Sequence, residues 1–152
     1  MNIVLFEPEI PVNTGNIGRT CVATNTKLHL IRPLGFFVDD KSLKRAGMDY
    51  WKSLDVQIYD NFEDFLTKNN NPKIFMVETK TDKLYTDAEY EMNDFIMFGK
   101  ETTGIPDEIL EQYKDTVVRI PMLPDTRSLN LSNAAAIVLF EALRQNGFIN
   151  LE

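Results

Sequence analysis

The stretch N-I-V-L-F-E-P-E-I-P-V-N-T-G-N-I-G-R-T, Asn2 to Thr20, decides the fold class of this 152-residue chain. Asn2 to Phe6 is short and largely apolar and stops at Glu7-Pro8, so it predicts a buried strand. A helical pattern follows from Thr14 to Asn25. A buried strand followed at once by a helix is typical of proteins in which helices cover a parallel sheet.

The same alternation continues along the rest of the chain. Further strands are predicted at Leu28–Ile31, Val56–Tyr59, Lys73–Val77, Phe95–Phe98 and Thr116–Ile120. Helical patterns occupy Ser42–Ala46, Phe62–Asn69, Asp107–Tyr113 and Leu131–Asn146. Short, continuously apolar strands separated by helices indicate a mostly parallel sheet with helices on both faces. The sequence therefore predicts an α/β fold in a single domain spanning residues 1–152, without repeats or linkers.

The composition excludes several classes of protein. Hydrophobic residues make up 43% and charged residues 26%, which is typical of a globular protein and too apolar for a disordered one. No apolar stretch reaches the ~20 residues of a membrane span, and the first residues do not form a signal peptide. We therefore expect a cytoplasmic protein. Because there is one cysteine (Cys21) and one histidine (His29), we expect neither an internal disulfide nor a bound metal.

The net charge of −7 at first argues against a nucleic acid partner, because phosphate binding needs a basic surface. The acidic surplus is confined to residues 61–115, which hold thirteen acidic and six basic residues. Residues 1–60 are balanced and contain a basic cluster, namely Arg32, Lys41, Lys44, Arg45 and Lys52. A polyanion could bind this cluster. A merely solvated basic surface is the alternative.

Three segments that follow predicted strands are rich in glycine, proline and small polar residues. They span residues 7–19, 99–106 and 121–133. In parallel α/β sheets, ligands bind in the crevice beyond the carboxyl ends of the strands. Gly15 and Gly18 could expose backbone N–H groups to an anion at a helix start, or could simply allow close packing there. Ser132 and Asn133 are suited to cap the last helix.

The last predicted helix, L-S-N-A-A-A-I-V-L-F-E-A-L-R-Q, is apolar on almost every side between Ala134 and Leu143. Such a helix must be buried on more than one face. In a chain of this size, the second face is expected to meet another subunit. We therefore predict a homodimer, with burial inside one monomer as the alternative.

Taken together, three motifs resemble those of the SPOUT methyltransferases. They are N-T-G-N-I-G-R-T (13–20), F-G-K-E-T-T-G-I-P (98–106), and I-P-M (120–122) with R-S-L-N-L-S-N-A-A-A (127–136). The segments R-P-L-G-F (32–36) and G-M-D-Y-W (47–51) extend the resemblance over nearly the whole chain. The likeness is greatest to the single-domain members that methylate the ribose 2′-hydroxyl of the wobble nucleotide, cytidine or uridine, in leucine tRNAs.

The resemblance implies a fold, a cofactor and site residues that the spacing of residues does not show. It implies a deep trefoil knot in the C-terminal half, although threaded loops are otherwise rare. It implies S-adenosylmethionine as cofactor, with S-adenosylhomocysteine as product. The cofactor-binding positions that match are Val77, Gly99, Ile120, Met122, Ser128 and Leu129. Where many relatives have a proline after the glycine of the second motif, this chain has Lys100, which we expect to alter only the stiffness of the loop.

The resemblance also implies which residues face RNA or take part in catalysis. The matching positions are Asn13, Arg19, Glu101, Ser128 and Asn130. We predict that Arg19, Glu101 and Asn130 are catalytic, and that Asn13 binds RNA together with the basic residues Arg32, Lys41, Lys44 and Arg45. Because a guanidinium hardly deprotonates in proteins, we expect Arg19 to orient the phosphate and hydroxyl of the substrate. The proton acceptor is left open between a phosphate, water and Glu101.

Other functions are compatible with parts of the pattern. The same reaction could act on ribosomal RNA, or the chain could be a non-catalytic RNA-binding dimer that keeps the fold. A flavodoxin-like nucleotide-binding domain shares the alternation of strands and helices, but it gives no reason for the long polar loop before an apolar last helix. His29 and Cys21 are predicted to be packed core residues.

Overall fold

The computed structural model describes residues 1–38 and 49–152 of the chain. The strands of this described part are β1 (Asn2–Phe6), β2 (Lys27–Ile31), β3 (Val56–Tyr59), β4 (Ile74–Val77), β5 (Phe95–Phe98) and β6 (Val117–Val118). The helices are α1 (Pro11–Ala23), α3 (Phe62–Lys68), α4 (Asp107–Gln112) and α5 (Leu131–Gln145), with 3₁₀ turns η1 (Asp49–Ser53), η2 (Tyr85–Asp87) and η3 (Lys114–Thr116). The predicted helix Ser42–Ala46 and the predicted RNA-binding residues Lys41, Lys44 and Arg45 lie outside the described residues.

All neighbouring strands pair in parallel, in the order β3-β2-β1-β5-β4-β6. The first strand is central, because Asn2 lies opposite Lys27 of β2 on one side and Phe95 of β5 on the other. The predicted α/β fold with a parallel sheet is therefore confirmed. This order also places the carboxyl ends of β1, β5, β4 and β6 beside one another at one edge of the sheet.

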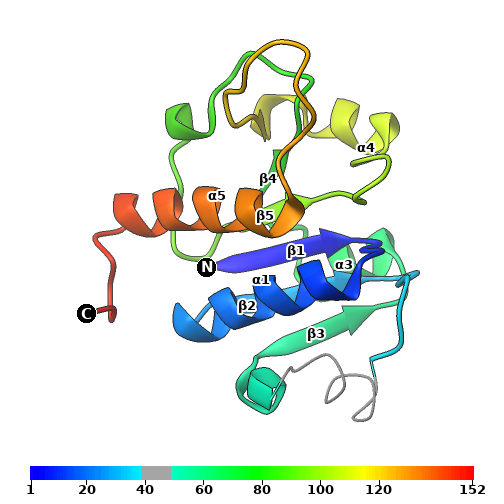
Figure 1. Ribbon diagram of the computed structural model, residues 1–152, viewed down its shortest axis with the longest axis vertical. Helices are drawn as coiled ribbons and strands as arrows, with labels where there is room; N and C mark the ends of the chain where they lie inside the picture. Colours follow the sequence, from blue (N-terminus) through cyan, green and yellow to red (C-terminus); the bar gives the residue numbers. More distant parts are fainter. Residues whose placement is uncertain (39–48) are drawn as a thin grey trace.

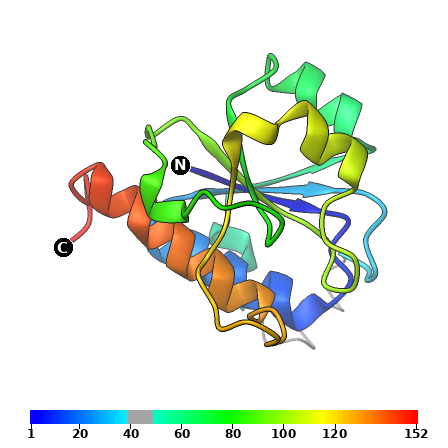
Figure 2. The same cartoon turned by 90° about the horizontal axis from the view of Figure 1, so that it is seen from above.

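Helices cover both faces of the sheet, as Figures 1 and 2 show. Helices α1 and α5 pack against each other and cover one face, where the core residues of the sheet include Ile3, Leu5, Leu30 and Phe98. Helices α3 and α4 cover the other face. Successive side chains of β1 alternate between these two cores, which is why the strand is apolar at almost every position.

Two predicted boundaries differ from the structure for physical reasons. Helix α1 begins at Pro11, three residues before the predicted start, because the fixed φ of proline suits the first turn of a helix. The predicted strand Thr116–Ile120 is reduced to Val117–Val118, which pair with Met76 and Val77 of β4. Strand β6 is therefore a short edge strand in the described part of the chain.

The last helix, α5, is buried along one stripe. Its buried residues are Ala135, Val138, Leu139, Ala142 and Leu143. On the outward side, Ile137 and Phe140 remain 37% and 47% exposed in the single chain. Part of the outward side of α5 is therefore apolar, as expected for a helix with a second covered face. The homodimer itself stays a prediction.

Candidate functional site

A cavity of about 420 Å³ lies at the carboxyl ends of β4 and β5, beside the start of α5. Its walls come from residues 77–80, 98–104 and 128–131, together with Ile10, Asn13, Ile120, Met122 and Ala134. The volume is within the range of small-molecule and cofactor pockets. This is the edge of the sheet where the sequence predicted a ligand-binding crevice.

All six predicted cofactor-binding residues line this cavity, although they come from three separate parts of the chain. They are Val77, Gly99, Ile120, Met122, Ser128 and Leu129. Val77 ends β4 and Gly99 follows β5, whereas the other four belong to the irregular segment between β6 and α5. The structure brings these residues together, and their contact with a cofactor remains a prediction.

The loop after β5 is folded tightly upon itself. The backbone N–H of Gly104 donates to the carbonyl of Lys100 at 2.9 Å, and that of Lys100 donates to the carbonyl of Gly104 at 3.2 Å. A Cβ atom on Gly99 would collide with the backbone of Gly104, and Gly104 itself has a φ of +71°. Both positions therefore require glycine. The Lys100 side chain forms an ion pair with Glu7 and so ties this loop to the end of β1.

Glu101 fixes the start of α1 to the loop after β5. Its carboxylate accepts hydrogen bonds from the backbone N–H of Glu9 at 2.8 Å, the backbone N–H of Ile10 at 3.1 Å, and the side-chain amide of Asn13 at 3.1 Å. Two of the predicted site residues, Glu101 and Asn13, therefore lie in direct contact.

The start of α5 joins the same network through Asn130. Its Nδ2 donates to Asn13 Oδ1 at 3.0 Å, and its Oδ1 accepts from the backbone N–H groups of Ser132 at 2.9 Å and Asn133 at 3.4 Å. The prediction that Ser132 and Asn133 cap this helix was wrong, because Asn130 is the N-cap and those two residues donate to it. Asn130 thus connects the third motif to the first.

Arg19, predicted to be catalytic, lies on the exposed side of α1 and is absent from the residues that line the cavity. Its guanidinium lies 5.0 Å from the ring centre of Tyr50, whose hydroxyl donates to the carbonyl of Gly15. A Cβ atom on Gly18 would lie 3.1 Å from Leu54 and 3.4 Å from the Tyr50 ring. Gly18 therefore allows η1 to pack closely on α1. Close packing was one of the two roles considered for this glycine from the sequence.

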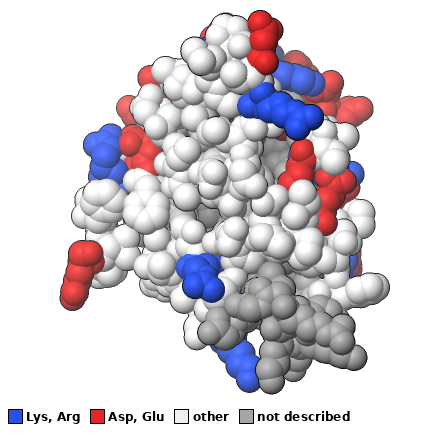
Figure 3. Space-filling model, in the orientation of Figure 1, with Lys and Arg blue, Asp and Glu red and all other residues white. Residues whose placement is uncertain are grey.

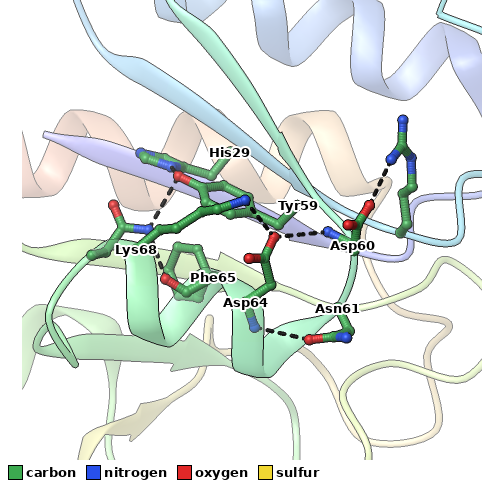
Figure 4. Close-up of polar contacts among 9 residues, drawn as sticks. His29, Tyr59, Asp60, Asn61, Asp64, Phe65 and Lys68 are labelled. Carbon is green, nitrogen blue, oxygen red and sulfur yellow. Dashed lines mark hydrogen bonds and ion pairs between the residues drawn. The ribbon is translucent and has the colours of Figure 1, made fainter.

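Arg32, predicted to bind RNA, follows β2 at the same edge of the sheet. Its Nη1 lies 2.8 Å from Asp60 Oδ1, and both side chains are more than half exposed. Figure 4 shows Asp60 beside Asp64, whose Oδ2 accepts from the Asp60 backbone N–H and from Lys68. Exposed ion pairs of this kind stabilise proteins little, so a phosphate group can compete with Asp60 for Arg32.

His29 is a packed strand residue, as predicted. It is 1% exposed, and its Nδ1 lies 2.8 Å from the Tyr59 hydroxyl (Figure 4). Its Nε2 lies 3.1 Å from Asn2 Oδ1. Burial, reinforced by the positive charge of Lys27, lowers the pKa of His29 to about 4. Cys21 is likewise buried, and burial raises the pKa of its thiol to about 12. Neither side chain lines the cavity.

Two residues that contact predicted or cavity-lining residues were not identified from the sequence. Glu78 lines the cavity and accepts a hydrogen bond from the backbone N–H of Ile105 at 2.7 Å, and Tyr50 contacts Arg19. Glu78 directly follows a predicted strand, so the rule that directs attention to strand ends could have identified it. Tyr50 lies within the G-M-D-Y-W segment, but nothing in that segment alone predicts a contact with α1.

The surface over α1 and α5 carries few charged side chains, as Figure 3 shows, and acidic and basic residues surround it. Among the described residues, no group of histidine, cysteine, aspartate and glutamate is arranged to hold a metal ion. None of the described helices is long and apolar enough to span a membrane.

Comparison with known proteins identifies the family. The SpoU rRNA Methylase family matches residues 1–140. A tRNA (cytidine(34)-2′-O)-methyltransferase of Saccharophagus degradans is 50% identical over 148 residues, which cover 97% of this chain and 96% of that relative. A solved structure described as giving insights into the 2-OH methylation of C/U34 on tRNA is 39% identical, with a TM-score of 0.89 and coverage of 96% and 95%.

A second solved structure contains a cofactor. The AdoMet-bound rRNA methyltransferase from Sinorhizobium meliloti is 27% identical, with a TM-score of 0.80, and the match covers 94% of this chain and 55% of that protein. The family predicted from the three motifs is thus confirmed by the sequence match and by similar structures. The chain belongs to the SpoU rRNA methylase family, a family of methyltransferases.

Proposed function

We propose that the protein transfers a methyl group from S-adenosylmethionine to the ribose 2′-hydroxyl of the wobble nucleotide of tRNA, in the cytoplasm. The proposed substrates are leucine tRNAs with cytidine or uridine at that position. The observation that carries this proposal is the convergence of the three sequence motifs on one cavity at the carboxyl edge of the parallel sheet. The relative from Saccharophagus degradans, which is similar over nearly its whole length, is named for the same reaction on cytidine 34.

The lining of the cavity suits the proposed cofactor. Apolar side chains such as Val77, Ile120 and Leu129 can hold the adenine ring, and the backbone groups around Gly99 offer donors and acceptors at close range. The sulfonium of the bound cofactor would supply an electrophilic methyl group. An AdoMet-bound methyltransferase with a similar fold supports this assignment.

The reaction requires the 2′-oxygen to be held in line with the methyl carbon, and positioning of this kind accounts for much of the rate enhancement. We assign this role to Arg19, which is exposed on the second half of α1 and can bind the phosphate next to the reacting ribose. Asn130, at the cavity wall and exposed, can hydrogen-bond the ribose. Arg32, with Lys41, Lys44 and Arg45, stays a proposed RNA-binding residue. Asn13 was predicted to bind RNA, but it is 5% exposed and bonded to Glu101 and Asn130, so we assign it to positioning of Asn130 beneath that surface.

The contacts of Glu101 help to decide whether it accepts the proton of the 2′-hydroxyl. Three donors from residues 9–13 already bind its carboxylate, which leaves only one of its about four acceptor positions for a substrate hydroxyl. We therefore assign Glu101 to positioning of Asn13, and the proton to a substrate phosphate or water. Of the three proton acceptors that the sequence left open, the proposal therefore keeps the phosphate and water.

We further propose that residues 1–152 form one domain with a C-terminal trefoil knot and that two chains form a homodimer. The knot is supported by the route of the chain, which runs from the edge strand β6 through residues 119–130 to α5 on the face of β5. The homodimer is supported by the exposed Ile137 and Phe140 of α5. The low charge of the surface over α1 and α5 supports it as well (Figure 3). A dimer would allow Arg19 of one subunit to serve RNA held at the cavity of the other.

A tRNA substrate is better supported than ribosomal RNA. The match to the tRNA enzyme of Saccharophagus degradans covers 96% of that protein, whereas the match to the rRNA methyltransferase of Sinorhizobium meliloti covers 55% of it. Somewhat less than half of the rRNA enzyme therefore has no counterpart in the match. The convergence of Asn13, Glu101 and Asn130 supports an enzyme over a non-catalytic RNA-binding dimer.

The proposal is tested by transfer of a labelled methyl group from S-adenosylmethionine to leucine tRNA, prepared both unmodified and already modified next to the wobble position. The wild-type protein is compared with Arg19→Ala, and the product is mapped with nucleases. We expect ribose methylation at the wobble nucleotide by the wild type and at least a hundredfold loss in the variant, on the order of magnitude of a lost transition-state contact.

The matched substrate control is the same tRNA with a 2′-deoxyribose at the wobble position. This control must accept no label, since it lacks the proposed acceptor oxygen. Label in the deoxy control would place the methyl group elsewhere and contradict the proposal. Transfer to ribosomal RNA alone, or binding of RNA without any transfer, would establish one of the two rival functions instead.

A further inference from the structure

Glu78 lies where three strand ends meet. It directly follows Val77 of β4, and its backbone N–H donates to the carbonyl of Val118 in β6 at 3.0 Å. Its side chain crosses to the loop after β5, where its Oε1 accepts from the backbone N–H of Ile105 at 2.7 Å. A single residue of the β4 end therefore contacts both neighbouring strand ends that supply walls of the cavity.

The loop is shaped to receive this carboxylate. Gly104 has a φ of +71°, and a Cβ atom there would collide with Glu78 Oε1. Ile105 is 3% exposed, so its backbone N–H has no ready access to water if the carboxylate is removed. A buried N–H without an acceptor is costly, and the loop would have to rearrange to satisfy it.

The other charged groups at the cavity have different partners. Lys80 lies 2.7 Å from Asp107, Lys100 pairs with Glu7, and Glu101 accepts from the start of α1. In the described part of the chain, Glu78 has no ion pair within 4.0 Å, and its second oxygen accepts only from the adjacent Thr79 backbone at 3.3 Å. Its contribution is therefore that of a hydrogen-bond acceptor for the loop.

We propose that Glu78 is a positioning residue that holds the loop of residues 99–105 in the shape that binds the cofactor. This inference rests on the proposed function in one respect, namely that the cavity binds S-adenosylmethionine. Glu78 acts through the loop, and no direct contact with the reacting atoms is assigned to it. A glutamine at this position keeps an acceptor oxygen and removes the charge, so Glu78→Gln separates the two properties.

The test compares Glu78→Ala, Glu78→Gln and the control Glu108→Ala, which removes an exposed carboxylate of α4 outside the cavity. Calorimetric titration with S-adenosylmethionine and S-adenosylhomocysteine gives dissociation constants. We expect Glu78→Ala to weaken binding of both at least about tenfold, since a hydrogen bond to a charged group is lost, and Glu78→Gln to restore most of the affinity. With saturating cofactor, methyl transfer by Glu78→Ala should recover most of its kcat.

Hydrogen exchange of the protein without cofactor supplies a second readout. Amides of residues 99–105 should exchange faster in Glu78→Ala and near the wild-type rate in Glu78→Gln, while exchange in β1 and β2 stays unchanged in both. Wild-type affinity in Glu78→Ala, or equal loss in the alanine and glutamine variants, would overturn the inference. If the wild type binds neither cofactor, the proposed function fails, and unchanged loop exchange in Glu78→Ala would separately refute the positioning role.

Discussion

Asn130 donates a hydrogen bond of 3.0 Å to the side-chain oxygen of Asn13, which joins two residues 117 positions apart in the chain. Because the amide of Asn13 also donates to Glu101 at 3.1 Å, both ends of this amide are occupied. Asn13 is 5% exposed and therefore has little freedom to turn. Its orientation is set by the second and third motifs together.

Asn13→Asp is expected to destabilise the protein at neutral pH by about 2 kcal/mol or more, because it places a second buried carboxylate against Glu101. The repulsion raises the pKa of the pair in the folded state, so the loss should shrink as the pH falls and one group takes up a proton. Urea unfolding at pH 7 and pH 5 measures both effects. Asn16→Asp, the same change on the exposed side of α1, should shift stability by no more than about 0.5 kcal/mol.

Gly104→Ala is expected to cost about 2 kcal/mol or more and to weaken cofactor binding, because it combines a positive φ with a collision against Glu78. Gly147→Ala is the matched control, since Gly147 has a φ of +69° but nothing within 4 Å of an added Cβ. That variant should lose about 1 kcal/mol from backbone strain alone. The free energy of unfolding of both variants is measured by thermal or chemical unfolding. If Gly104→Ala and Gly147→Ala lose the same amount, the contact with Glu78 contributes nothing to stability.

Tyr50→Leu is expected to lower kcat for methyl transfer about three- to tenfold, because the ring that lies against the Arg19 guanidinium is lost. The dissociation constant for the cofactor should not change, since Tyr50 does not line the cavity. Tyr50→Phe keeps the ring and loses only the hydroxyl that donates to Gly15, so it should retain most of the activity. A phenylalanine variant as slow as the leucine variant would assign the effect to the hydroxyl.

Unfolding stability is expected to depend on the protonation of His29. Its pKa is lowered to about 4 in the folded protein, so the unfolded chain binds the proton more readily between pH 6.5 and 4. The contribution of neutral His29 is fully present above pH 6.5 and is lost as the pH falls through this window, by roughly 3 kcal/mol in total. His29→Phe should flatten the plot of stability against pH there, whatever its stability at pH 7. Parallel curves for wild type and variant would disprove this.

Strands β1, β3 and β5 match their predicted limits, although β3 is a partly exposed edge strand. Strands β1 and β5 do so because both faces of each strand are packed, which leaves a continuous apolar run with abrupt ends. The edge strand β6 was predicted too long, since apolar residues beyond Val118 line the site and do not extend the ladder. Apolar composition alone does not distinguish a residue that pairs in the sheet from one that lines the cavity.

The site residues that could be predicted from the sequence are those that belong to the three motifs. The resemblance named Asn13, Glu101 and Asn130, and the structure places them in one hydrogen-bonded chain. The contact between Glu78 and Ile105 was not predictable, because it depends on which strands become neighbours in the sheet. The capping role of Asn130 was missed because Ser132 and Asn133 are equally good caps by residue type.

The pairing of Asn2 with Phe95 also has a consequence during synthesis on the ribosome. The first strand leaves the ribosome early, but its neighbour β5 follows more than ninety residues later, a wait of roughly 5 to 20 s at ordinary rates of translation. The nascent chain can pair β1 with β2 during that interval, yet the other edge of β1 stays unprotected. The cavity therefore forms only after α5 has been synthesised, and a protein cut short before α5 would have no complete binding site.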